Sequence, residues 1–409
     1  DDDQFDLGYH VRRSALPRPG SMGQLRELVS RIVSRPLDRT RPLWEVYFVE
    51  GLSEGRVALL YKTHQVLVDG VETVDLGQVL LDVSATPKDL ESDDWCQRRA
   101  PSPLGLMRRD LESVFLELTE ADTLVDTVRS TSGAALRNAE AAAEQTRKVL
   151  NALSGRRPVR ESPIAGELSQ QRRVVTVDTP LESYRTIRSV HGGTINDGIL
   201  ATVAGGLRGW LMTRAESMGG IRQIRAVVPV SVIDAELEAT SLGSQIAAHF
   251  VDLPIGESSP VVRLHQVSYS FQAHKETGRG VAADRLAGIA GFAPTTFHAI
   301  GSRVAARERR SYQLNVTNVP GPQSPLYAAG AEMVSSYPVP PLLPGHPLAI
   351  GVTSYNGRVF YGITADRDQM PDADLLGACL LESLDELMDA SSGARPRAPR
   401  GRRRTSKKV

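Results

Sequence analysis

The sequence predicts an α/β protein with two lobes containing mixed sheets and a helical bridge between them. Helix-like and strand-like patterns alternate on both sides of residues 101–160, whereas the strand-like signal disappears within that stretch. The chain of 409 residues is long enough for two sizeable hydrophobic cores. Its hydrophobic fraction of 41% and charged fraction of 23% are typical of a soluble globular protein.

The first lobe is expected to contain two helices and two strands. They are predicted at residues 21–38, 43–52, 55–65 and 71–83, in the order helix, strand, strand, helix. The second strand is nearly continuous in apolar residues from Val57 to Thr63, so we expect it to be buried on both faces. The pair Asp69-Gly70 marks a turn before the second helix.

The bridge is predicted to be helical throughout. Ser102-Pro103 favours a helix start, and apolar residues follow at spacings of three to four as far as Leu118. Residues 133–155 form a long Ala-rich pattern that ends at Gly155. Because the strand-like pattern disappears here and resumes afterwards, we expect this region to connect two separate lobes.

The second lobe is expected to mix strands and helices. Strands are predicted at 172–180, 224–232, 244–254 and 312–322, and helices at 181–192, 194–214, 259–276 and 372–389. The helix at 194–214 is capped by Thr194 or Asn196 in this interpretation. Asn356-Gly357 lies between two alternating apolar runs and predicts a hairpin over residues 346–366.

Several classes of chemistry find little support in the sequence. The motifs of a phosphate loop, a serine nucleophile elbow and a dinucleotide-binding turn are absent, and the histidines lack metal-ligand spacing. Two cysteines, Cys96 and Cys379, are too few for a disulfide framework, which favours a reducing, cytoplasmic setting. The formal net charge of zero provides no overall field for nucleic acid, and no apolar run reaches the roughly 20 residues of a membrane span.

The stretch from His64 to Gly70 is the strongest candidate for a catalytic loop. It reads HQVLVDG and directly follows the strand predicted at 55–65. It resembles the H-H-x-x-x-D-G loop of the bacterial wax ester synthase/diacylglycerol acyltransferase family, within the chloramphenicol acetyltransferase-like superfamily. Further similar segments follow in the family's order, at residues 34–52, 192–208, 227–232, 249–254 and 317–322.

The resemblance implies a fold, an activity and a set of partners. Residues 1–100 would be an N-terminal acyltransferase lobe truncated at its start, 101–160 the bridge and 161–391 the C-terminal lobe. The implied activity is transfer of an acyl group from acyl-CoA to diacylglycerol or a long-chain alcohol, with no cofactor. Attachment to the surface of a membrane or lipid droplet is also implied. The composition itself predicts that residues 392–409 are a basic disordered tail or are weakly attracted to an anionic surface, and the charge and histidine spacing predict no nucleic acid partner and no metal.

The loop departs from the family pattern at its second position. In the family this position holds the histidine that acts as general base, and here it holds Gln65, while His64 matches the first histidine and Asp69 the structural aspartate. A neutral carboxamide cannot accept a proton from an alcohol, although it can orient a hydroxyl group. Since neighbouring side chains of an extended backbone point to opposite faces, His64 is not expected to replace Gln65 directly.

Two further segments have both a structural and a functional interpretation. Asn196 and Asp197 could simply cap a helix, but the resemblance implies that this pair lies near the catalytic loop and supports activity. Residues Thr317, Asn318, Pro320 and Gly321 form a rigid strand-to-turn segment by default, and a wall of the substrate tunnel by resemblance. The Pro-rich segment 337–349 is either a lipid entrance or a buried crossover.

Three accounts of the chain therefore stay open. It is an acyltransferase that is weak or has an altered base, a catalytically silent relative that binds acyl-CoA or lipid or regulates an active paralogue, or a chain in which Gln65 was introduced to trap a complex.

Overall fold

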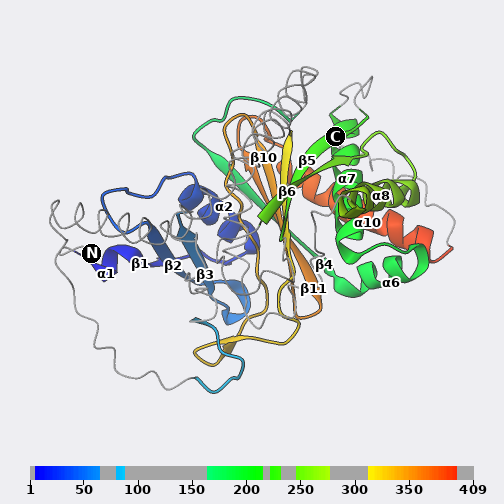
Figure 1. Cartoon of the computed structure of the whole chain (residues 1–409). Coiled ribbons are helices and arrows are strands. Elements are labelled where there is room, and N and C mark those ends of the chain that lie inside the picture. Colours follow the sequence, from blue (N-terminus) through cyan, green and yellow to red (C-terminus); the bar gives the residue numbers. More distant parts are fainter. Residues whose placement is uncertain are drawn as a thin grey trace, which may run out of the picture. The chain divides into compact units, whose positions relative to one another are not determined.

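The computed structural model describes residues 5–64, 80–87, 164–214, 222–231, 246–276 and 312–393. The chain divides into two compact units. One unit takes in Asp1–Leu7, Arg39–Pro42 and Glu91–Arg160, and the other takes in Gly8–Asp38, Leu43–Leu90 and Glu161–Val409. Every described strand belongs to the second of these units (Figure 1).

The N-terminal part of this unit contains a small mixed sheet. Its order is β1 (Val11–Ala15), β2 (Trp44–Glu50) and β3 (Ala58–Thr63), with β1 parallel and β3 antiparallel to β2. A short helix, α1 (Leu7–His10), precedes β1, and a turn of 3₁₀ helix, η1 (Ser53–Gly55), joins β2 to β3. Helix α2 (Met22–Val33) begins at the capping box of Ser21 and Gln24, and its Ile32 packs with Val49 of β2.

The expectation that the strand ending at Thr63 is buried on both faces is wrong. Among the described strands, β3 is at the edge of its sheet and pairs with β2 alone. Ala58 and Leu60 pack into the cluster beneath α2, whereas Leu59, which points the other way, is 38% exposed. The run of apolar residues therefore correctly predicts a strand here, but it does not show that both faces of the strand are buried.

The larger sheet has six strands in the order β4-β11-β10-β7-β5-β6. Their bounds are Arg172–Pro180 for β4, Arg358–Asp366 for β11, Leu348–Tyr355 for β10, Leu314–Val319 for β7, Ile224–Ser231 for β5 and Ile246–Leu253 for β6. The three central strands β10, β7 and β5 are mutually parallel, and antiparallel strands flank them. The expected α/β architecture with mixed sheets is confirmed, and β10 and β11 form the predicted hairpin at Asn356-Gly357.

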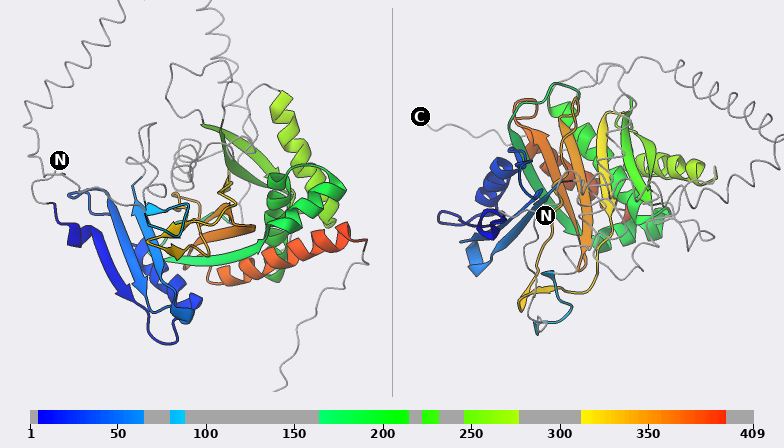
Figure 2. Two further views of the ribbon diagram at one scale, coloured as in Figure 1. Left: turned by 90° about the horizontal axis from the view of Figure 1, so that it is seen from below. Right: turned by 60° about the vertical axis from the view of Figure 1, so that its left-hand side comes forward.

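Four helices cover one face of the larger sheet (Figure 1 and Figure 2). They are α6 (Leu181–His191), α7 (Ile195–Thr213), α8 (Pro260–Glu276) and α10 (Ala373–Ser391). The main hydrophobic core lies between them and the sheet. Helix α10 approaches α7 closely because α7 has glycines at the contact; a Cβ atom at Gly206 would lie 2.6 Å from Leu380 Cδ2.

The Pro-rich segment 337–349 crosses the opposite face of the sheet before it enters β10. A Cβ atom at Gly362 would lie 1.6 Å from the carbonyl oxygen of Pro338, so the crossing backbone lies directly on β11. Leu343 is 8% exposed and packs with Val227 and Tyr312. The segment is therefore a crossover that is only partly buried, since Pro341 and Pro344 are exposed, and its role as a lipid entrance stays a prediction. A small hairpin of β8 (Tyr327–Ala328) and β9 (Ala331–Glu332) precedes it.

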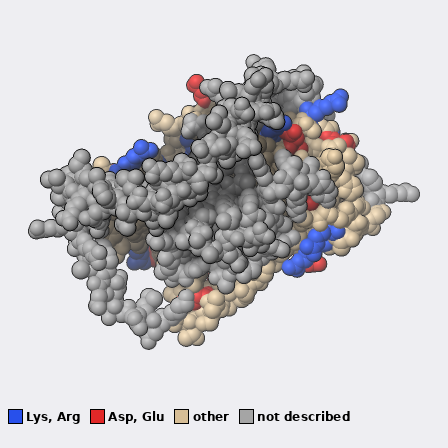
Figure 3. All heavy atoms as spheres, viewed as in Figure 1, with Lys and Arg blue, Asp and Glu red and all other residues tan. Residues whose placement is uncertain are grey.

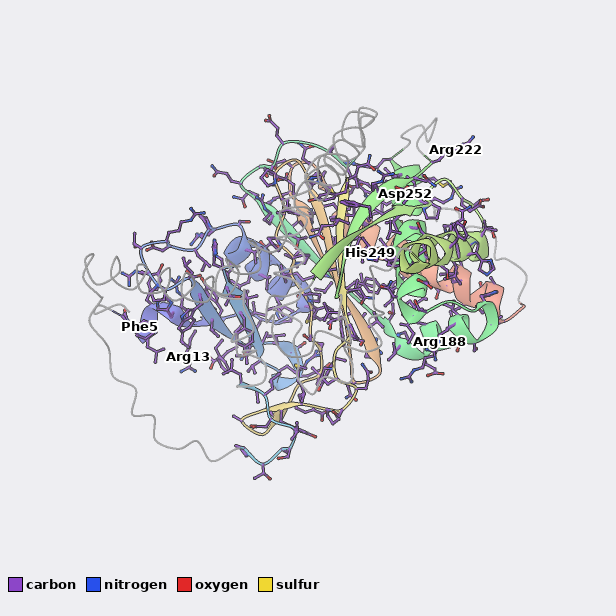
Figure 4. All side chains as sticks on the ribbon, viewed as in Figure 1. Phe5, Arg13, Arg188, Arg222, His249 and Asp252 are labelled. Carbon is purple, nitrogen blue, oxygen red and sulfur yellow. The ribbon has the colours of Figure 1, made fainter. Side chains whose placement is uncertain are left out.

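Surface charges of both signs are interspersed among the described residues of the face in Figure 3. On β5 and β6, for example, Arg225 Nε lies 2.8 Å from Asp252 Oδ1 (Asp252 is labelled in Figure 4). Hydrogen bonding to Asp252 raises the pKa of Arg225. Exposed pairs of this kind contribute about 0–1 kcal/mol each.

Within the described ranges, no helix combines the length and the apolar character that a bilayer crossing requires. The helices predicted at 102–118 and 133–155 lie outside the described residues, as does most of the helix predicted at 71–83.

Candidate functional site

His64 follows β3 directly, where the sequence predicts the start of a catalytic loop. Its backbone N–H donates a hydrogen bond to the carbonyl oxygen of Leu43 at 2.9 Å, which continues the pairing beyond the end of the strand. Its side chain is half-buried. The other predicted loop residues, Gln65, Asp69 and Gly70, lie outside the described residues.

A buried charged network joins β2 to β3, the strand that leads to His64, and the sequence reasoning missed it. Glu45 of β2 is 6% exposed; its carboxylate accepts a hydrogen bond from the Tyr47 hydroxyl at 2.7 Å and lies 3.9 Å from Lys62 Nζ. Burial, together with the hydrogen bond to Glu45, raises the pKa of Tyr47 to about 12. The sequence signal that could have revealed this network is Glu45 itself, an acidic residue at an inward-facing position of an apolar strand.

Lys62 also ties β3 to helix α2. Its ammonium group donates to the carbonyl oxygens of Ile32, at 3.2 Å, and of Arg35, both at the C-terminal end of the helix. A cation is favoured there because helix-end carbonyls lack intrahelical donors. Burial lowers the pKa of Lys62, and the Glu45 carboxylate opposes this shift. The strand that carries His64 is therefore fixed against α2 two residues before the loop.

Asp197 is a helix-capping residue. Its carboxylate Oδ2 accepts the backbone N–H of Thr194 at 2.9 Å, and its own N–H donates to Thr194 Oγ1 at 3.1 Å. These reciprocal bonds form a capping box with Thr194 as the N-cap of α7, and Asp197 is only 3% exposed. The structural interpretation of the Asn-Asp pair thus accounts for Asp197.

Asn196 has a different partner. Its side-chain Oδ1 accepts a hydrogen bond of 2.8 Å from Asn318 Nδ2. Asn318 lies near the C-terminal end of β7, so this bond joins the first turn of α7 to the end of a central strand. The structure brings together two residues that the sequence placed in separate candidate segments.

The rest of the predicted 317–322 segment does not meet Asn196. Thr317 precedes Asn318 on the same strand, so its side chain points to the other face of the sheet, where it is fully buried opposite Gly351. Gly321 N–H donates to Ser354 Oγ at 3.2 Å, and a Cβ atom at position 321 would lie 2.2 Å from the Ser354 carbonyl oxygen. Pro320 and Gly321 therefore form a tightly packed turn beyond the strand.

The chemistry that these described groups offer is hydrogen bonding by neutral amides. An amide Nδ2 group donates two hydrogen bonds, so Asn196 retains donors while its oxygen is bonded to Asn318. Within the described ranges, no group of three His, Cys, Asp or Glu side chains could hold a metal ion.

Comparison with known proteins assigns the chain to a family. Residues 1–199 match the model of the wax ester synthase/diacylglycerol acyltransferase catalytic domain, and residues 242–388 match the C-terminal domain of the same proteins. A probable diacylglycerol O-acyltransferase of Mycobacterium tuberculosis is 32% identical over 393 residues, which span 95% of this chain and 83% of the relative. The O-acyltransferase WSD of Acinetobacter baylyi is 27% identical over 386 residues, which span 91% and 79% of the two chains.

A solved structure shares the fold. The wax ester synthase/diacylglycerol acyltransferase of Marinobacter aquaeolei superposes with a TM-score of 0.65 at 25% sequence identity. The superposition covers 96% of this chain and 82% of that one. The fold, the order of the motifs and the sequence matches thus point to the same family.

Proposed function

Because the chain belongs to the wax ester synthase/diacylglycerol acyltransferase family, we propose that it transfers a fatty acyl group from acyl-CoA to the hydroxyl group of diacylglycerol or a long-chain alcohol. Membership makes the chain an O-acyltransferase, and the donor and the acceptor are the part that we propose. The observation that carries the proposal is the match of both family domains, one of which contains the His64 to Gly70 loop.

The reaction is a direct transfer. The acceptor oxygen attacks the thioester carbonyl carbon, negative charge develops on the carbonyl oxygen, and the carbon–sulfur bond then breaks. The acceptor gives up its hydroxyl proton, which ends on the released CoA thiol, so no oxidant or further reactant is needed. A group that accepts the proton and donors that face the carbonyl oxygen are the two requirements of this chemistry.

Gln65 does not meet the first requirement, a group that accepts the hydroxyl proton. A carboxamide cannot take the hydroxyl proton, and the loss of a general base typically costs about 10²–10⁴-fold in rate. A missing base slows proton transfer but does not by itself remove the groups that bind acyl-CoA. We therefore expect ordinary binding and slow turnover. The second candidate, a silent relative that binds acyl-CoA or lipid, is favoured by the same residue.

Replacing Gln65 with histidine tests the proposal. Release of CoA thiol is measured with long-chain acyl-CoA and with diacylglycerol or a long-chain alcohol as acceptor. Gln65→His is expected to raise acceptor-dependent thiol release by about 10²-fold or more, because it restores a base at the loop position. Gln65→Asn is the matched control, since it changes the size of the side chain but adds no base.

Two results would contradict parts of this account. Robust turnover with Gln65 in place that is abolished by His64→Ala would identify His64 as the base. No turnover by either Gln65→His or the unmodified chain, with acyl-CoA binding intact, would favour the silent relative.

We also propose that the chain works at the surface of a membrane or lipid droplet, because both acceptors partition into lipid. Flotation with liposomes that contain diacylglycerol is expected to carry part of the protein upward. Surface attachment would be contradicted if the same fraction of protein floated with and without liposomes. It would also be contradicted if no protein floated although the chain still acylated a dispersed acceptor.

A further inference from the structure

Two polar side chains are buried on the face of the larger sheet that the Pro-rich segment 337–349 crosses. They are Asn315 of β7 and Thr364 of β11, with exposed fractions of 1% and 2%. Leu314 and Val316 belong to the core on the helix-covered face, so Asn315 between them points to the other face. Among the described residues, no polar group lies within hydrogen-bonding distance of either amide atom of Asn315 or of the Thr364 hydroxyl. Buried polar groups are normally hydrogen-bonded to protein or to ordered water.

Ala349 of β10 lies between these two side chains. It is paired with Asn315 on one side and with Thr364 on the other, so the three side chains stand in one row on the same face of the sheet. Neighbouring strands are about 4.8 Å apart, which places the Cα atoms of Asn315 and Thr364 about 10 Å apart. Their polar ends extend toward each other over the small Ala349 methyl group, and one water molecule bridges about 5.6 Å between two polar atoms. The row therefore has the spacing that a bridging water requires.

The segment that crosses this row is poor in hydrogen-bond donors. A Cβ atom at Gly351 of β10 would lie 3.1 Å from Pro340 Cδ, and Leu343 packs on Val227, which is paired with Asn315. The crossing chain thus passes from β10 to β5 over the Asn315 side of the row. The five residues before Leu343 read PVPPL. Because proline has no N–H, this stretch offers few donors to the amide oxygen of Asn315.

We propose that ordered water binds between Asn315 and Thr364, over Ala349, and bridges the sheet to the Pro-rich segment. Water both donates and accepts, so it serves the Asn315 amide oxygen, which prolines cannot, and the Thr364 hydroxyl at the same time. A buried water molecule typically has about three hydrogen-bond partners, and these two side chains supply two of them. This part of the crossover would then rest on hydrogen-bonded water and not on a dry apolar contact.

Thr353 of β10 provides a matched comparison on the same face of the sheet. It is 1% exposed, and its hydroxyl likewise has no hydrogen-bond partner among the described residues. Its paired neighbours are Val319 and Phe360, whose side chains have no polar atom. Since a buried water needs two to four polar partners, Thr353 is not expected to bind one. Replacing each threonine with valine therefore makes the same chemical change with and without a water site.

Oxygen-17 magnetic relaxation dispersion on the full chain measures the long-lived internal waters. Thr364→Val is expected to reduce the dispersion amplitude by the contribution of about one water, because only one side-chain partner remains. Thr364→Ser keeps the hydroxyl group and is expected to retain that contribution, and Thr353→Val is expected to leave it unchanged. Where Thr364→Val fails to fold, Asn315→Leu removes the other partner and is expected to cause the same loss.

Stability to urea gives a second readout, in which the sign of the change is informative. With water bound, Thr364→Val takes away a hydrogen-bond partner of a buried group and is expected to lower the folding equilibrium constant by about tenfold. In a dry row, the same substitution would remove an unpartnered hydroxyl and would raise the constant. A rise is expected for Thr353→Val, where no water is bound.

The inference does not rest on the proposed function, and its test requires no turnover. Loss of the water contribution in Thr364→Val, with its retention in Thr364→Ser and Thr353→Val, is the result expected. A dispersion amplitude that Thr364→Val leaves unchanged would overturn the inference, whatever the effect on stability. An equal loss in Thr353→Val would also overturn it, because the water would then not belong to the row of Asn315 and Thr364.

Discussion

Cys379 lies on α10 against Gly209 of α7, with 5% of its surface exposed. Burial, with smaller effects of Glu382 and Asp372, raises the pKa of its thiol to about 11. Since the thiolate is the reactive form, only about one thiol in a thousand would be ionised near pH 8. In a Cys96→Ser variant, we expect Cys379 to react with a disulfide reagent slowly in the folded protein and rapidly in urea.

The same residue makes stability depend on alkaline pH. The folded state keeps the Cys379 proton up to about pH 11, whereas the unfolded chain releases it near the ordinary value of 9.0. The stabilising contribution is therefore complete below that lower value and declines as the pH rises between the two. Cys379→Ala is expected to remove this decline. Rapid labelling of the folded Cys96→Ser variant would contradict the burial of Cys379.

Part of what the candidate residues contact could be predicted from local sequence patterns, and part could not. Thr194 with Asp197 three residues later is a capping pattern that can be read locally. The partner of Asn196 cannot be predicted from the local sequence, because Asn318 is 122 residues further along the chain. The network of Glu45, Tyr47 and Lys62 did leave a local signal, the acidic residue at a buried position of β2.

At the element scale, α2 covers the open edge of the larger sheet. Ser30 Oγ accepts the N–H of Val174 at 2.9 Å, and Ser34 Oγ accepts that of Arg172 at 2.8 Å. Four residues of helix rise about 6 Å and two residues of strand about 6.8 Å, so the spacings match. Each hydroxyl donates to a carbonyl oxygen four residues earlier in α2, at 2.7 Å in both cases, which aims its lone pairs at β4.

Removing these hydroxyl groups should loosen the contact between α2 and β4. Ser30→Ala and Ser34→Ala are each expected to lower the free energy of unfolding by about 1 kcal/mol, because each leaves a strand N–H without its partner. Urea unfolding followed by circular dichroism measures the loss. Ser189→Ala is the matched control. This exposed serine of α6 likewise donates to a carbonyl oxygen of its own helix, at 2.8 Å, but this hydrogen bond involves no strand. Equal small effects at all three positions would contradict the edge-covering role.

Strand β3 shows why single elements are easier to predict than their neighbours. The apolar run from Val57 to Thr63 correctly indicated a strand, but it did not indicate how many strands would pair with it. Its antiparallel partner β2 is the preceding strand, and among the described strands no second partner lies on its other side. The Asn356-Gly357 hairpin was predictable because both strands and their turn are adjacent in sequence.

At the scale of the whole molecule, the class of fold was predictable and the order of strands was not. Alternating helix and strand patterns led to an α/β protein with mixed sheets, as observed. In the order β4-β11-β10-β7-β5-β6, the hairpin of β10 and β11 lies between β4 and β7, which both precede it in the chain. No local sequence pattern predicts this position. The predicted domain ranges 1–100, 101–160, 161–391 and 392–409 stay predictions.

In the proposed reaction the acyl group moves directly from CoA to a lipid hydroxyl, and the lack of a base at position 65 limits the rate. A single-turnover experiment with radiolabelled acyl-CoA and excess enzyme tests it most directly. We expect label to appear in the ester of diacylglycerol or long-chain alcohol, slowly for the unmodified chain and about 10²-fold faster for Gln65→His. Label that never reaches an acceptor in either protein, although acyl-CoA is bound, would contradict the account.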